Sequence, residues 1–186
     1  GGLVEMVDLV SPWDLVELGD DAVPLFAQMF RDHEIVMYNG HSFYGSLDIL
    51  DDPANYPSET YQILFMNSCW SYEYYTKQVF QNKETEDDPS GWALADVVNN
   101  TTYAYFSQME TSTRVLLFNL LAGAESGGID DAGRRFSWQH IIGVMNDEAM
   151  GVCPVDADPM DCRHYQPRSK HEVYGVSGVR DNTYQP

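Results

Sequence analysis

The chain has 186 residues, and its 44% hydrophobic content is enough for one domain with a buried core. Its 29 acidic residues against 10 basic ones give a formal net charge of −19. This charge opposes binding to nucleic acid and to anionic membrane surfaces, and it favours neutral or cationic partners. No stretch approaches the roughly 20 apolar residues that span a bilayer, so we expect no membrane insertion.

The chain begins with two predicted elements. Residues 3–10 have the composition of a strand. Asp20 and Asp21 are candidate N-caps for a helix that runs to Arg31, with apolar residues at helical spacing on one face.

Two short apolar runs follow, and each ends at a residue that is common in nucleophilic catalysis. Residues 34–40 precede His41, and residues 61–68 precede Cys69. Both runs are rich in β-branched and aromatic residues and are too short for a helix, so both are predicted to be buried strands. A helix over residues 72–80 is expected directly after the cysteine.

The second half of the chain has a weaker pattern. A polar run over residues 85–91 predicts a solvated loop. Strands are expected over residues 95–98 and 102–106, separated by Asn99 and Asn100. Two further helices are expected, over residues 114–121, ended by Gly123, and over residues 138–146, capped by Ser137. The alternation of strands and helices predicts the α/β class with a mainly parallel sheet.

His41 and Cys69 occupy equivalent positions after two strands. In an open α/β sheet, side chains just past the carboxyl ends of neighbouring strands converge on one crevice. Only the thiolate of a cysteine attacks carbonyls, and a basic partner or the positive end of a helix favours it. Taken singly, the cysteine is typical of a small buried side chain and the histidine of a loop residue. Together they predict a nucleophile and its base.

The motifs around these residues resemble a known family. Tyr38-Asn39-Gly40-His41-Ser42 and Asn67-Ser68-Cys69-Trp70-Ser71-Tyr72 are similar to the motifs of caspase-like cysteine peptidases. That group includes caspases, legumains, clostripain and the gingipains, and the bacterial gingipain-like branch is the most similar. The resemblance covers about residues 21–146, with a weaker similarity in residues 174–186.

The resemblance implies a three-layer α/β/α sandwich with His41 as general base or acid and Cys69 as nucleophile. The family usually carries another strand and helix before the histidine strand, so this chain is expected to lack an N-terminal strand or to be part of a longer domain. The resemblance also implies an oxyanion hole made of the backbone N–H groups of Cys69 and of Gly40 or Ser42. The family usually has glycine after the histidine. Ser42 still supplies an N–H there, but it favours the tight turn less than glycine does.

The expected substrate-binding residues are Asn67, Asp48 and Trp70. In the family, the residue two before the nucleophile often faces the pocket for the side chain that precedes the cut. Asn67 is neutral and forms no charge-assisted pair with arginine. A basic residue before the cut is therefore expected only if Asp48, Asp51 or Asp52 lines the pocket, and a polar or small residue otherwise.

Residues 151–186 are expected to form a tail that packs on the domain made by residues 1–150. Cys153 and Cys162 close a short loop and predict a disulfide. A disulfide indicates an oxidising compartment, so we expect an extracellular, periplasmic or cell-surface bacterial protein. The same loop carries three carboxylates that are either calcium ligands or a solvated acidic turn: Asp156, Asp158 and Asp161.

We therefore expect a secreted cysteine endopeptidase that acts on peptide or protein substrates and requires no cofactor. Two other functions remain open. One is an inactive caspase-like fold that serves as an interaction domain, which the Ser42 departure and the aromatic-rich segment 70–75 favour. The other is an acidic calcium-binding surface module. No glycine-rich phosphate loop, nicotinamide fingerprint or Gly-x-Ser-x-Gly motif occurs.

Overall fold

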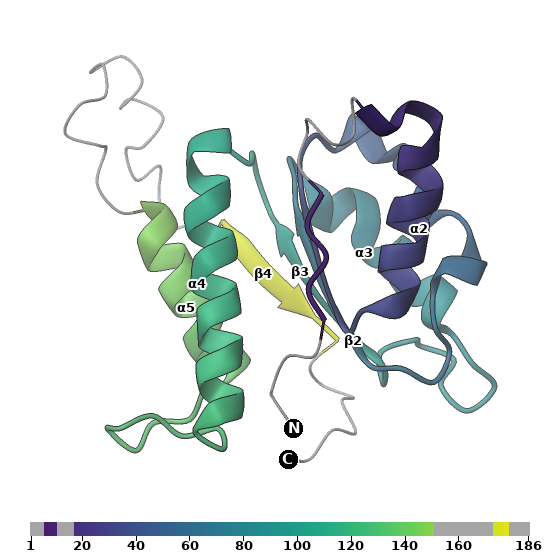
Figure 1. The fold of residues 1–186 in the computed structure, drawn as a ribbon. Coiled ribbons are helices and arrows are strands. Elements are labelled where there is room, and N and C mark those ends of the chain that lie inside the picture. Colours follow the sequence, from purple (N-terminus) through teal and green to yellow (C-terminus); the bar gives the residue numbers. More distant parts are fainter. Residues whose placement is uncertain (1–5, 11–16, 151–172, 179–186) are drawn as a thin grey trace.

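The computed structural model describes residues 6–10, 17–150 and 173–178. A four-stranded sheet in the order β1-β2-β3-β4 runs through its centre (Figure 1). The neighbours β1, β2 and β3 are parallel, whereas β4 pairs antiparallel with β3. The predicted α/β class with a mainly parallel sheet is therefore confirmed. The four strands are β1 (Ile35–Asn39), β2 (Gln62–Asn67), β3 (Ala95–Asn100) and β4 (Tyr174–Ser177).

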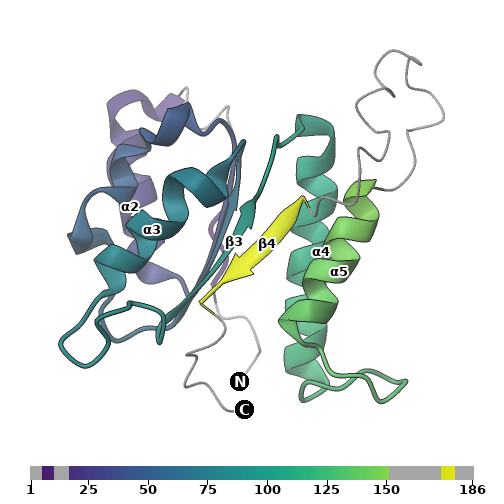
Figure 2. The ribbon, with the colours of Figure 1, turned by 180° about the vertical axis from the view of Figure 1, so that it is seen from behind.

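Helices cover both faces of the sheet, as Figures 1 and 2 show from opposite sides. On one face lie α2 (Ala22–Asp32) and α3 (Ser71–Lys83). On the other face lie α4 (Phe106–Glu125) and α5 (Trp138–Met150). Short 3-10 turns precede α2 and fill the loop between β1 and β2: η1 (Gly19–Asp21), η2 (Phe43–Gly45), η3 (Asp48–Leu50) and η4 (Pro53–Asn55).

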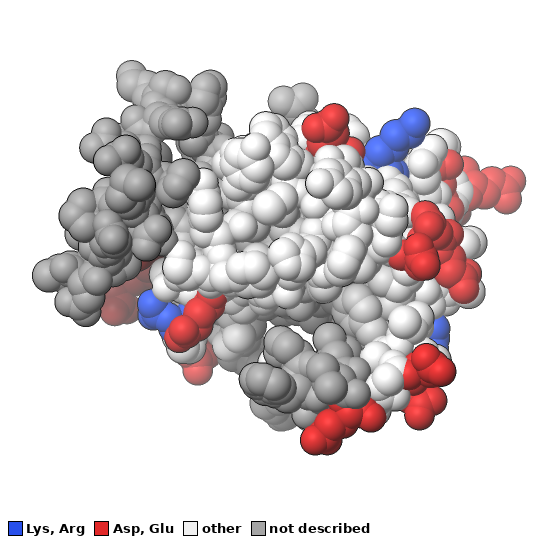
Figure 3. All heavy atoms as spheres, turned by 90° about the horizontal axis from the view of Figure 1, so that it is seen from above, with Lys and Arg blue, Asp and Glu red and all other residues white. Residues whose placement is uncertain are grey.

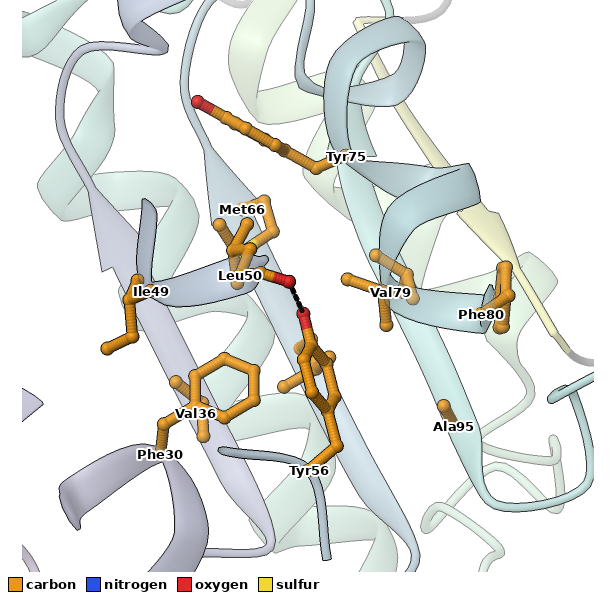
Figure 4. Close-up of a cluster of buried hydrophobic side chains, with 12 residues drawn as sticks. Phe30, Val36, Ile49, Leu50, Tyr56, Met66, Tyr75, Val79, Phe80 and Ala95 are labelled. Atoms are coloured by element: carbon orange, nitrogen blue, oxygen red, sulfur yellow. Dashed lines mark hydrogen bonds between the residues drawn. The ribbon is translucent and has the colours of Figure 1, made fainter. Parts of the chain in front are cut away.

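Two apolar cores result from the alternation of side chains along the strands. Leu64 and Met66 of β2 face α2 and α3, whereas Phe65 between them faces α4 and α5. In the first core, Phe30 of α2 packs edge-on against Tyr56, with ring centroids 5.0 Å apart. The hydroxyl of Tyr56 donates to the Leu50 carbonyl at 3.0 Å (Figure 4). The loop between β1 and β2 is therefore anchored in the core.

The predicted strand over residues 3–10 is not formed in its described part. Residues 6–10 have no regular structure, and Met6, Val7 and Leu9 are exposed. Their apolar composition favours a strand locally, but no neighbouring strand pairs with them. Asp21 also makes no side-chain capping bond at the start of α2, whereas Ser137 Oγ does accept from the His140 N–H at 3.3 Å and caps α5 as predicted.

The region after β3 also differs from expectation. Asn99 and Asn100 do not separate two strands but are the last residues of a strand that is buried throughout. The Asn99 side chain donates to Thr76 Oγ1 at 2.7 Å, and the Asn100 N–H donates to Ser71 Oγ at 2.9 Å. The helix α3 thus supplies acceptors for the Asn99 side-chain amide and for the Asn100 backbone N–H inside the sheet. Residues 102–105 are a loop, and α4 begins at Phe106.

Among the described helices, none has the length and apolar character needed to cross a membrane. The predicted disulfide between Cys153 and Cys162 lies outside the described residues. So do the calcium candidates Asp156, Asp158 and Asp161. In the described part of the tail, residues 173–178 contribute β4, the antiparallel neighbour of β3.

Candidate active site

His41 and Cys69 follow two adjacent strands in the same register. Asn39, the last residue of β1, pairs with Asn67, the last residue of β2. Each candidate residue lies two positions beyond its asparagine. Because neighbouring strands are about 4.8 Å apart, the register places both residues at one carboxyl edge of the sheet.

Cys69 lies in the turn that joins β2 to α3 and is partly exposed. Its thiol donates to the Ala104 carbonyl, with Sγ and oxygen 3.7 Å apart. The next residue, Trp70, is in the left-handed region with φ of 55°, and its N–H donates to the Thr102 carbonyl at 2.8 Å. The loop after β3 thus holds both residues of this turn.

His41 is exposed, and two phenylalanine rings contact its imidazole. The centroid of the His41 ring lies 6.1 Å from that of Phe43 and 5.2 Å from that of Phe106, and both pairs are edge-on. Phe106 comes two residues after Ala104, the carbonyl partner of Cys69. His41 and Cys69 therefore both contact the segment that leads into α4.

Two tyrosine hydroxyls hold the carbonyl groups of His41 and Ser42 in place. Tyr38 donates to the His41 carbonyl at 2.9 Å, and Tyr75 donates to the Ser42 carbonyl. Burial raises the pKa of Tyr38, and it raises the pKa of Tyr75 to about 12, so both remain donors at neutral pH. A Cβ at Gly40 would lie 2.6 Å from the Tyr38 hydroxyl oxygen, so a larger residue there would displace the Tyr38 side chain.

Four polar side chains tie the ends of β1 and β2 to α4. The amide of Asn67 donates to Asn39 Oδ1 at 2.8 Å and to Ser112 Oγ at 3.0 Å. The hydroxyl of Thr113 donates to the same Asn39 oxygen at 3.0 Å. We call Asn39, Asn67, Ser112 and Thr113 the asparagine clamp. It fixes the separation of the two strand ends that carry His41 and Cys69.

The clamp changes the interpretation of Asn67. Its side chain is only 1% exposed and its amide is engaged within the protein. This arrangement favours a positioning role for Asn67 over direct contact with substrate. The sequence contained a signal for the clamp, since Asn39 and Asn67 stand at the same distance before His41 and Cys69.

Of the backbone N–H groups expected to form an oxyanion hole, one already has a hydrogen-bond acceptor within the protein. The Gly40 N–H donates to the Asn67 carbonyl at 3.2 Å and so belongs to the sheet. Within the described residues, the N–H groups of Ser42 and Cys69 have no hydrogen-bond acceptor. Of the two alternatives predicted beside Cys69, Ser42 is thus the donor that remains available.

His41 and Cys69 are not joined by a hydrogen bond in the described part of the chain. In the absence of substrate, catalytic hydrogen bonds are often long and tighten only in the complex. The site as it stands therefore has a thiol and an imidazole at one edge, without a hydrogen bond between them.

The expected carboxylates of the substrate pocket are largely engaged elsewhere. Asp51 accepts from the Gln78 side chain of α3, and Asp52 caps the Ala54 N–H at 2.9 Å. Asp48 is exposed at the start of η3. Trp70 remains at the site, where its ring packs edge-on against that of Tyr103 at 5.6 Å.

Sequence reasoning missed a set of strained aromatic residues at this edge. Phe43, Tyr44 and Trp70 are the non-glycine residues with positive φ in the described part of the chain. Such conformations cost about 1–3 kcal/mol each and concentrate at functional sites. Trp70 directly follows Cys69, and Phe43 and Tyr44 lie two and three residues after His41. No propensity rule identifies them, because loop packing imposes the conformation.

No cluster of three or more histidine, cysteine or carboxylate side chains that could hold a metal ion occurs among the residues described. Comparison of the chain with protein-family models, with curated proteins and with solved structures gave no match. Evidence for function therefore comes from the geometry of the site.

Proposed function

We propose that the protein is a cysteine endopeptidase in which Cys69 is the nucleophile and His41 the acid–base residue. The observation that supports this most is the register of β1 and β2, which brings both residues to one carboxyl edge. The thiol lies at the turn into a 13-residue helix, and unused N–H groups lie beside it. A resemblance to caspase-like peptidases in the same two motifs agrees with this assignment.

In this mechanism the Cys69 sulfur attacks the scissile carbonyl while the thiol proton passes to His41. The N–H groups of Cys69 and Ser42 stabilise the oxyanion, at about 3 kcal/mol per donor. His41 then gives its proton to the leaving amine, and a thioester remains on Cys69. Water attacks the thioester with His41 as base, which releases the acid and restores the thiol.

Substitution of the two residues tests the proposal. Cys69→Ala and His41→Ala should each abolish hydrolysis of a casein or peptide substrate, because residues that act as one unit are lost together. The melting temperature should hardly change, since both side chains lie at strand ends outside the cores. His140→Ala on α5 is the matched control and should retain activity. Unaltered turnover in either variant of the pair would refute the assignment.

A second candidate is an inactive fold of the same kind that binds peptides without cutting them. The lack of a hydrogen bond between His41 and Cys69 within the described residues favours it. A peptide chloromethyl ketone separates the two functions. In a peptidase this reagent alkylates Cys69, and the rate of alkylation falls strongly in the His41→Ala variant because His41 activates the thiol. In a binding domain the rate of alkylation does not depend on His41.

A further inference from the structure

Exposed aromatic side chains concentrate around the candidate dyad. The described residues contain nine exposed aromatic side chains, and seven of them lie in the three segments that follow β1, β2 and β3. Single exposed apolar residues are common, but a concentration on one face indicates a binding surface. We call these seven the aromatic rim: Phe43, Tyr44, Trp70, Tyr72, Tyr103, Tyr105 and Phe106.

The backbone keeps part of this rim outside the core at an energetic cost. Phe43, Tyr44 and Trp70 combine positive φ with exposed rings. Burial of the aromatic ring could offset the cost of the positive φ, but these three rings are exposed. Holding such rings in solvent beside the dyad is explained if another molecule covers them.

In its described part, the middle of this face carries no Lys, Arg, Asp or Glu side chain (Figure 3), although the chain has a net charge of −19. Figure 3 looks onto the end of the molecule where α4 begins, which is the carboxyl edge of the parallel strands. Acidic and basic side chains lie at the periphery, and the described centre is white. Asp51 and Asp52 already have partners within the protein, the Gln78 side chain and the Ala54 N–H, rather than a basic side chain of a substrate.

We propose that the site binds peptides with a large apolar or aromatic side chain next to the scissile bond. This inference rests on the proposed peptidase function and specifies its substrate class. The rings of Phe43 and Phe106 lie 6.1 and 5.2 Å from that of His41. An extended peptide advances about 3.3 Å per residue, so a ring at this distance reaches a substrate side chain one or two residues from the reacting carbonyl.

The proposal differs from the two expectations drawn from sequence. A basic preference required a loop aspartate in the pocket, and two of the three candidates have other partners. A small or polar preference followed from Asn67, whose side chain is buried in the asparagine clamp. Asp48 stays exposed in the loop after His41, but most of the exposed side chains named at this edge are aromatic.

A set of fluorogenic peptides that differ only in the residue before the bond measures the preference. Peptides with Phe or Leu should have kcat/KM at least about tenfold above those with Arg, Asp or Ala, the discrimination that an apolar contact supplies. A preference for Arg or Asp, or equal rates for all five, would overturn the inference and leave the peptidase function standing. If no peptide is cut and no chloromethyl ketone labels Cys69, the proposed function itself fails.

Two rim variants and one control tie the preference to the aromatic rim. Phe106 and Phe118 lie on the same helix with similar exposure, 67% and 59%, but about 18 Å apart along its axis. Phe106→Ala should lower the ratio of kcat/KM for the Phe peptide over the Ala peptide at least about fivefold, mainly through KM. Phe118→Ala should leave this ratio unchanged.

Tyr103→Ala removes a rim residue that has no contact with His41 among the described ring pairs, so it separates substrate binding from disturbance of the imidazole. A fall in the ratio with either rim variant supports the inference. An unchanged ratio in both folded variants, or an equal fall with Phe118→Ala, contradicts it. Thermal melting of each variant shows that it is folded.

Discussion

Replacement of Lys83 should alter how stability depends on pH. Lys83 is the last residue of α3 and is 3% exposed. Its Nζ donates to the carbonyls of Pro57 and Thr60 at 2.8 and 2.9 Å, and it makes no ion pair with any described residue. Burial lowers the pKa of Lys83 from 10.5 to about 8, since the charged form is poorly solvated there.

The sign of the effect follows from proton binding in the two states. The pKa of Lys83 is lower in the folded protein, so the unfolded chain binds more protons between about pH 8 and 10.5. Stability therefore rises with pH across this window. From about pH 7 to about pH 9.5, the shift corresponds to a gain of about 2 kcal/mol in the free energy of unfolding.

Urea unfolding of the wild type and of Lys83→Met, measured at several pH values between about 7 and 9.5, tests this result. Methionine keeps the length and apolar character of the side chain but does not titrate. The loss of the two Lys83 hydrogen bonds lowers stability at every pH, so the quantity compared is the slope of the free energy of unfolding against pH. Lys77→Met, an exposed lysine of the same helix, is the control.

The free energy of unfolding of the wild type should rise by about 2 kcal/mol relative to that of Lys83→Met over this pH range, and that of Lys77→Met should change as in the wild type. Buried tyrosines with raised pKa values, such as Tyr56 and Tyr174, lower stability only as the pH rises above about 10, and both proteins contain them. Parallel curves for the wild type and Lys83→Met would refute the reasoning.

Two further substitutions test the fold and the clamp. Gly91→Ala should destabilise by several kcal/mol in thermal or urea unfolding, because at φ of 70° a Cβ overlaps with the Phe80 carbonyl oxygen. Gly127→Ala has a similar φ of 67° with open space around it, and it should cost only about 1 kcal/mol. Equal costs would contradict the overlap. Asn67→Leu removes two hydrogen bonds of the asparagine clamp and should cost about 1–3 kcal/mol and lower kcat more than it raises KM. Thr113→Val removes only the hydrogen bond from Thr113 to Asn39 and should change both stability and kcat less. An unchanged kcat of the proposed peptidase in Asn67→Leu would contradict the positioning role of Asn67.

Much of the site could be predicted because its main signals are local. The runs before His41 and Cys69 are strongly apolar, and the helix after Cys69 starts within two residues of the expected position. The register of β1 and β2 then brings the two residues to one edge, as expected for parallel neighbours. What could not be predicted is the use of each surrounding group. The Gly40 N–H is taken by the sheet, and the Asn67 amide is taken by Asn39 and Ser112, which come from distant parts of the chain.

The sequence by itself determined the alternation of strands and helices and the order in which His41 and Cys69 occur along it. Burial of short β-branched and aromatic runs depends mainly on the residues within each run. Only the tertiary structure decided that Asn99 and Asn100 complete β3, because α3 supplies the hydrogen-bond partners that a turn would otherwise find in solvent. It also decided that aromatic residues with positive φ lie close in sequence to His41 and Cys69, since loops take such conformations only when packing from other segments holds them.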